Sequence, residues 1–221
     1  RPYIRDGLFE LCLRTIHLLK SRGEEALTPK LLFGSGAAAS GFLVHWEGPR
    51  RGQSQLDLLP GLTSPTQAAA DEFREWGDLR TLVRRVLQLL RQRYQYVVVD
   101  IGQDYNMPLH RAVLEEADEV LVTVPPNRAA LLDTRAAMVG LRHLFGAALK
   151  KFKLVITAYD PHFGISEREI VQQLGLPRLI TIPHDAVTAM QAVNNGVPFV
   201  LTDQDGPLGQ AVLRLAAAYQ P

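Results

Sequence analysis

The chain has 221 residues, of which 47% are hydrophobic and 21% are charged, and this globular composition excludes a disordered chain, a collagen and a coiled coil. Lys and Arg number 24 and Asp and Glu number 23, so the formal net charge of +1 gives no overall field that would attract nucleic acid. The single cysteine, Cys12, can form no internal disulfide and indicates a reducing compartment. No apolar run is long enough to cross a membrane. Because the chain begins at Arg1 rather than at Met, we expect it to be part of a longer protein.

The first part of the chain is irregular. Apolar spacing predicts a helix over 4–20, and short strands are expected at 31–33, 42–46 and 56–59. From Asp78 a clear amphipathic helix begins, with leucines and valines along one face and arginines off it. We therefore expect an irregular N-terminal part, residues 1–55, followed by a regular core over 56–221 within one domain.

The second part alternates strand and helix with short connections. The elements expected in chain order are a strand at 96–100, a helix at 107–116, a strand at 119–124, a helix at 128–145, a strand at 152–156, a helix at 166–174, a strand at 179–182 and helices at 186–194 and 207–218. This alternation predicts an α/β fold, a doubly wound, mostly parallel sheet with helices on both faces. Ligands of such sheets bind at the carboxyl ends of the strands.

Asp100 follows the apolar run Tyr96–Val99 at one such carboxyl end. An acid there is typical of a Walker B group on the Mg²⁺ side of a nucleotide, with Gly102 allowing a close backbone approach. The same acid is equally common as a turn or cap residue. Gly36–Gly41 has two glycines at phosphate-loop spacing, but Phe42 and Leu43 stand where Lys and Ser or Thr are required. The sequence therefore contains no phosphate-binding loop.

Three segments in the same order resemble the MinD/ParA superfamily. Tyr94–Asp100 (YQYVVVD) resembles its Walker B segment, and Arg111–Thr123 (RAVLEEADEVLVT) resembles the stretch that follows. Ile182–Asp185 (IPHD) with Ala192–Pro198 (AVNNGVP) resembles its segment beside the base. The spacing from Gly164-Ile165-Ser166 to that segment is most similar to the CpaE/TadZ branch, whose members localise pilus-assembly and secretion systems. The resemblance covers roughly residues 56–218.

The resemblance implies a P-loop NTPase-like fold that here lacks its first strand and loop, with ATP and Mg²⁺ as cofactors and a homodimer as the assembled state. Asp100 matches the Walker B aspartate, with no direct metal ligand implied, and Gly102 stands where the family often has Pro. Thr157 stands where the family usually places an Asn near the adenine, and Thr cannot make the two-pronged amide contact. Pro183, His184 and Asp185 match the loop beside the base. ATP hydrolysis is expected only if a phosphate loop lies upstream of residue 1, and not from this chain alone.

Three functions remain open. The first is a spatial organiser of the CpaE/TadZ kind, cytoplasmic and recruited by protein partners to a pole or to the inner membrane. The second is a scaffold of the same fold that does not hydrolyse ATP. The third is a partitioning ATPase that binds DNA, for which a basic face would be needed; the candidates are Arg80, Arg84, Arg85, Arg91 and Arg93. The C-terminal segment 208–219 carries one basic residue and is typical of a core helix rather than a membrane anchor.

Overall fold

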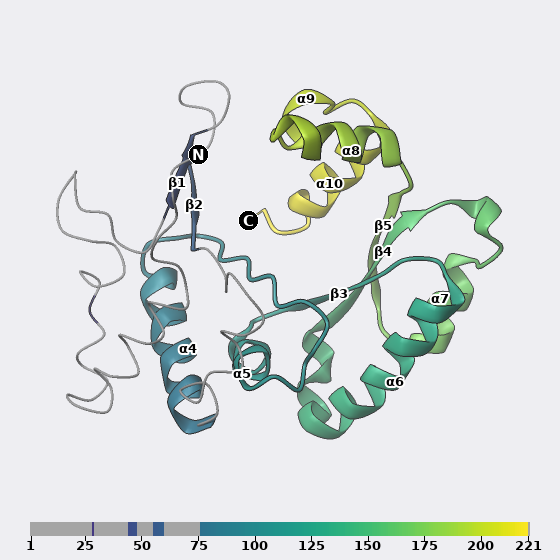
Figure 1. The fold of residues 1–221 in the computed structure, drawn as a ribbon. Coiled ribbons are helices and arrows are strands. Elements are labelled where there is room, and N and C mark those ends of the chain that lie inside the picture. The colour runs from purple at the N-terminus through teal and green to yellow at the C-terminus, as the bar shows by residue number, and fades with distance from the viewer. Residues whose placement is uncertain (1–27, 29–43, 48–54, 60–75, 221) are drawn as a thin grey trace. The chain divides into compact units, whose positions relative to one another are not determined.

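The computed structural model describes residues 28, 44–47, 55–59 and 76–220 (Figure 1). The chain divides into two compact units, Arg1–Ala117 and Asp118–Pro221, which are described separately. The helix expected at 4–20, the strand expected at 31–33 and Cys12 lie outside the described residues.

The first unit contains a two-stranded antiparallel ribbon. Strand β1, Val44–Glu47, pairs with β2, Gln55–Leu58, and Val44 lies opposite Leu58. The strands expected at 42–46 and 56–59 are thus confirmed within two residues. The Tyr94 hydroxyl donates a hydrogen bond to the Asp57 carboxylate of β2. Burial, with the Asp57 hydrogen bond and charge adding to it, raises the pKa of Tyr94 to about 12.

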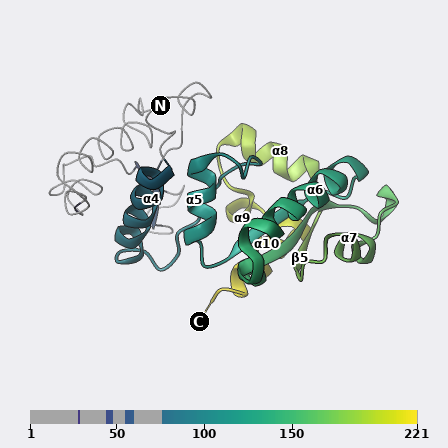
Figure 2. The same ribbon diagram turned by 90° about the horizontal axis from the view of Figure 1, so that it is seen from below.

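Two helices pack together in this unit, α4 (Trp76–Arg91) and α5 (Pro108–Glu116), and Figure 2 shows them side by side. Leucines at helical spacing bury one face of α4, so the predicted amphipathic helix is confirmed. Pro108 opens α5, where its missing N–H has no helical partner to lose. The buried side chains of the pair are Leu79, Leu82, Val83, Val86, Leu87, Leu89, Leu90, Leu109, Ala112 and Leu114.

The strand expected at Tyr96–Asp100 is wrong. These residues form no strand, and the side chain of Val98 is 93% exposed. A run of β-branched residues favours extended backbone, but a strand also needs hydrogen bonds to a neighbouring strand. Among the residues that the structure describes, no strand pairs with this run.

The second unit is built on a three-stranded parallel sheet. Its strands are β3 (Val120–Val124), β4 (Phe152–Tyr159) and β5 (Arg178–Pro183), in the order β3-β4-β5. Val120 pairs with Phe152 at the start of the sheet and Val124 with Ile156 further along. Three of the four predicted parallel strands are therefore confirmed, and the fold is α/β.

Helices connect and cover these strands (Figure 1). They are α6 (Arg128–Phe145), α7 (Glu167–Leu174), α8 (Ala186–Asn195), α9 (Phe199–Thr202) and α10 (Pro207–Ala217). Helices α6 and α7 pack against each other, and α10 packs on β5. The predicted helices are confirmed within one residue, whereas α9 and the two short 3₁₀ helices, Gly146–Lys151 and Pro161–Phe163, were not expected.

Side chains from strands and helices share the core of this unit. In the central strand β4, the consecutive residues Leu154, Val155 and Ile156 are all buried, because a helix-covered parallel sheet shields both faces of its middle strand from water. Helix α7 is capped at both ends. Ser166 accepts a hydrogen bond from the backbone N–H of Glu169 at its start, and Gly175 ends it with φ 64°. The largest fully buried side chains of the unit are Phe152, Met138, Leu154, Ile156, Ile170, Leu174 and Val124.

Candidate functional site

The carboxyl end of β4 contains a bulge. Ile156 pairs with Thr181 and Tyr159 with Pro183, so β4 uses three residue steps where β5 uses two. Ala158 accommodates the extra residue with φ 50°, a left-handed conformation that is uncommon for a residue other than glycine. The bulge lies beside Thr157, which is half-buried. The bulge thus determines the course of the backbone at the carboxyl edge of the sheet. The residues predicted to lie beside the base are at this edge.

The ends of β4 and β5 are tied together beyond the bulge. The backbone N–H of His184 donates to the carbonyl of Tyr159 at 2.9 Å. The His184 ring lies edge-on to Phe163, with 5.5 Å between ring centroids. The structure therefore places the predicted residues Thr157, Pro183 and His184 at one carboxyl edge.

Asp185, the next predicted residue, is the N-cap of α8. Its Oδ1 accepts from the backbone N–H of Thr188 at 2.9 Å. Hydrogen bonds from Thr188 lower the pKa of Asp185, with the nearby His184 contributing a smaller effect. This carboxylate is therefore ionised at neutral pH and caps the N-terminus of α8.

A second acid at this edge, Asp160, was not expected from the sequence. Its Oδ1 lies 2.8 Å from the backbone N–H of His162, which donates to it, and 2.7 Å from the ring Nδ1 of the same residue. These contacts lower the pKa of Asp160. The Asp-Pro-His order is a turn signal that could have located this cap, because Asp accepts from backbone two residues on.

A depression of about 570 Å³ lies beside the ends of β3 and β4. Asn127 on its rim caps α6 by accepting from the N–H of Ala130 at 2.8 Å. Arg128 follows with an exposed side chain, and Phe163 is 50% exposed. The lining residues are Pro126, Asn127, Arg128, Phe163, Gly164 and Ile165. The sequence predicted a strand that ends at residue 124 but did not identify this depression.

Asp100 and Gly102 lie in the first unit. Asp100 is exposed, and its Oδ1 accepts from the backbone N–H of Gly102 at 3.2 Å. Gly102 has φ 67°, a conformation that glycine adopts without cost. The acid therefore closes a short turn, which is one of the two roles that the sequence left open. Asp104 does the same four residues later, with 3.0 Å from its Oδ1 to the backbone N of Asn106.

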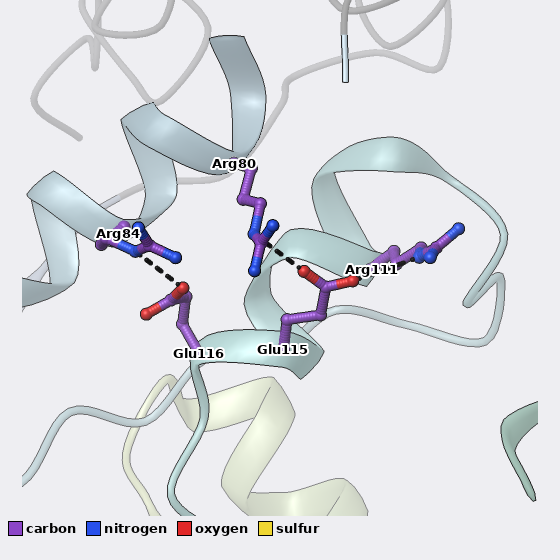
Figure 3. A network of polar contacts seen from close by, with 5 residues as sticks. All are labelled: Arg80, Arg84, Arg111, Glu115 and Glu116. Atoms are coloured by element: carbon purple, nitrogen blue, oxygen red, sulfur yellow. Dashed lines mark hydrogen bonds and ion pairs between the residues drawn. The ribbon is translucent and has the colours of Figure 1, made fainter. Parts of the chain in front are cut away.

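Arginines of α4 contact acids of α5 (Figure 3). The Nε of Arg80 lies 3.1 Å from Glu115, and the Nε of Arg84 lies 3.0 Å from Glu116. Arg111 approaches Glu115 at 3.4 Å from the other side. Two members of the predicted basic face thus have carboxylate partners, which lowers the positive charge available for DNA.

Two general features of the described residues bear on function. Within the ranges that the structure describes, no group of three His, Cys, Asp or Glu side chains is arranged to hold a metal ion. In the same ranges, no helix combines the length and apolar character needed to span a membrane.

Comparison with known proteins gives a fold. The sequence matches no family model and no curated protein. The structure is similar to a ParA family ATPase from Chlorobium tepidum TLS, with a TM-score of 0.69 and 18% identity over 96% of this chain and 75% of that one. It is also similar to the MinD of a MinC:MinD cell division complex from Aquifex aeolicus (TM-score 0.60, 20% identity, 96% and 80% covered).

A third similar structure is the septum site-determining protein MinD complexed with Mg-ADP from Pyrococcus horikoshii OT3, with a TM-score of 0.57 and 19% identity. This match covers 73% of the present chain and spans 62% of the archaeal one. At such low identities the similarity establishes architecture alone. The chain has the α/β fold of the ParA and MinD ATPases.

Proposed function

We propose that the protein is a MinD/ParA-type spatial organiser that acts in the localisation of a pilus-assembly or secretion complex. The observation that carries the proposal is the fold similarity to a ParA family ATPase over 96% of the chain. Sequence segments typical of the CpaE/TadZ branch support the finer assignment. One of the similar structures, MinD, was solved in a complex with MinC, which supports protein partners as the means of recruitment.

The carboxyl edge of β4 and β5 is the proposed base side of a nucleotide site. Thr157, Pro183 and His184 would lie beside an adenine, and Asp185 would hold the loop through its cap of α8. Asp100 and Gly102, which lie in the first unit, are the proposed Mg²⁺-side and phosphate-side residues on the sequence resemblance alone. A MinD neighbour that binds Mg-ADP supports ATP and Mg²⁺ as the cofactors to test.

The residues present do not fit tight ATP binding. The printed sequence has no Gly-Lys-Ser/Thr loop, and Thr157 lacks the amide that grips an adenine edge. Contacts to the base alone correspond to millimolar affinity, about −4 kcal/mol. We therefore derive no hydrolytic step for this chain, and its organising role rests on contacts with proteins.

A scaffold that does not hydrolyse ATP is the second candidate. The contact between Asp100 Oδ1 and the Gly102 N–H favours it, because the carboxylate is already used in a turn. Asp100→Asn distinguishes the two, with Asp104→Asn as the matched control, since both acids are exposed and close the same kind of turn. In the full-length protein, an ATPase loses activity by orders of magnitude only in Asp100→Asn. A scaffold functions normally with either change.

The organising role is tested in the native cell. The full-length protein fused to a fluorescent protein should form foci at a pole or at another discrete site, and deletion of its gene should abolish pilus assembly or secretion. A uniform distribution together with normal pili and secretion would contradict the proposal.

A further inference from the structure

Charge is divided unevenly along the second unit. Between Asp133 and Asp160 the chain carries five basic residues and no acidic one. The remainder of the unit, 118–133 and 160–221, carries nine acidic and four basic residues. The unit is thus formally neutral but strongly segregated. The five basic residues are Arg135, Arg142, Lys150, Lys151 and Lys153.

Four of these five residues lie in residues 142–153, which we term the basic turn, at the junction of α6 and β4. The turn is held rigidly: the rings of Phe145 and Phe152 lie 5.3 Å apart, and the Lys151 ammonium lies 5.4 Å from the Phe145 centroid. Arg142 donates to the carbonyl of Leu174 at 2.7 Å, which fixes its position without neutralising it. No carboxylate among the described residues pairs with Lys150.

Negative charge is presented at the opposite end of the sheet. Asp160 and Asp185 follow the carboxyl ends of β4 and β5, and Asp203 and Asp205 stand in residues 203–206, which we term the acidic loop. In Figure 1 the basic turn lies below the sheet, whereas α8 and α9, which lead into the acidic loop, lie above it. Arg128 also lies at this end of the sheet, so this end carries both charges, with acidic residues in the majority.

Contacts within the unit also hold the backbone of the acidic loop. The Nε2 of Gln210 donates to the carbonyl of Gln204 at 3.0 Å. Gly206 and Gly209 allow the chain to fold closely on Asp203; a Cβ at Gly209 would lie 2.0 Å from the Asp203 carbonyl oxygen. Asp205 is exposed, and no residue that the structure describes bonds to its carboxylate. Both charged surfaces are therefore presented on fixed backbone.

We propose that the basic turn binds the acidic loop of a second copy of the protein, so that copies associate head to tail. A formally neutral unit with separated charges is attracted to its own copy in that orientation. A polyanion such as duplex DNA or an anionic bilayer would be attracted by the basic turn but repelled by the acidic remainder. Contacts between unlike surfaces extend into rings or open chains, which suits a protein that marks one place in a cell.

Sedimentation velocity of the full chain at increasing concentration tests this. Association is expected at 50 mM NaCl, with the dissociation constant rising about tenfold or more at 500 mM because salt screens exposed charges. Lys150→Glu/Lys153→Glu should abolish association, and so should Asp203→Lys/Asp205→Lys. A mixture of the two variants should associate again, because each reversed surface meets its complement. If circular dichroism shows that Asp203→Lys/Asp205→Lys disturbs the fold, Asp203→Asn/Asp205→Asn takes its place as the acidic-loop variant.

The matched control is Arg168→Glu/Arg214→Glu, which changes the net charge as much as the basic-turn variant but lies outside both surfaces. It should associate like the original protein. The proposal is overturned if the full chain is monomeric at 50 mM NaCl, if the mixture stays monomeric, or if the control loses association equally. Binding of duplex DNA or phosphatidylglycerol vesicles that Lys150→Glu/Lys153→Glu removes, from a chain that remains monomeric, would assign the turn to a polyanion instead and also overturn it.

Discussion

Two apolar runs rich in β-branched residues adopt different structures in this molecule. Val97–Val99 in the first unit forms no strand, and Val98 is 93% exposed. Leu154–Ile156 in the second unit forms the central strand, and Val155 is 1% exposed. The difference lies in the partners: β4 is hydrogen-bonded to β3 and β5 and is covered by helices, whereas the first run is paired with no strand among the described residues. Composition gives a strand its tendency, and neighbours decide whether it forms.

The largest effect expected from this comparison is that of a charge placed in each run. Val155→Asp should lower the free energy of unfolding by about 3–5 kcal/mol, because it buries an unpaired carboxylate. Val98→Asp should change it by less than about 0.5 kcal/mol, as is usual at an exposed position. Urea denaturation followed by circular dichroism measures both. An equal loss in the two variants would mean that Val98 is buried against a partner strand after all.

Glycines sharpen the comparison next. Gly209→Ala places a Cβ 2.0 Å from the Asp203 carbonyl oxygen, so backbone must move and the expected loss is about 1–3 kcal/mol. Gly102→Ala meets nothing within 4 Å and pays only for φ 67°, about 1 kcal/mol. Thermal denaturation should rank them in that order. The reverse ranking would show that the acidic loop yields more easily than its contacts indicate.

Stability at high pH probes the attachment of Tyr94 to β2. Because the pKa of Tyr94 is raised to about 12, its contribution is complete below pH 10, the ordinary pKa, and is lost as the pH rises from 10 through 12. Tyr94→Phe should cost about 1 kcal/mol at neutral pH and show less of this alkaline loss. Tyr105→Phe is the control, since its hydroxyl has no partner among the described residues. Identical alkaline profiles for Tyr94→Phe and the original protein would contradict the assignment.

The smallest effect concerns the ion pairs of Figure 3. Arg84 and Glu116 lie 3.0 Å apart, but the arginine side chain is about half exposed. A double-mutant cycle with Arg84→Ala and Glu116→Ala should give a coupling of about 0.5 kcal/mol that falls in high salt. Leu82→Ala in the same helix should cost about 2–5 kcal/mol, because Leu82 is buried. A coupling near 3 kcal/mol would make the charge network, rather than the leucine face, the main contact.

Sequence periodicity located nearly every described helix and strand because each buries one face or is buried on both. It could not foresee the exposure of Val98, since pairing is a tertiary property. The sequence Thr157-Ala158-Tyr159 also does not predict the bulge, because nothing in these residue types favours a left-handed conformation at Ala158. At the candidate site, the meeting of Thr157 with Pro183 and His184 was predictable, since parallel strands end at one edge. The Asp160–His162 pair depends on loop geometry that the strand pattern does not encode.

Titration of the full chain with Mg-ATP by isothermal calorimetry tests the central claim most directly, with Thr157→Asn and Asp100→Asn alongside. The account predicts millimolar affinity or none for the 221-residue chain and for its Asp100→Asn variant, because these 221 residues contain no phosphate loop. Thr157→Asn should bind several-fold more tightly, since it restores an amide at the proposed base side. Micromolar affinity of the original chain that Asp100→Asn abolishes would contradict the account and identify the protein as a nucleotide-binding ATPase in its own right.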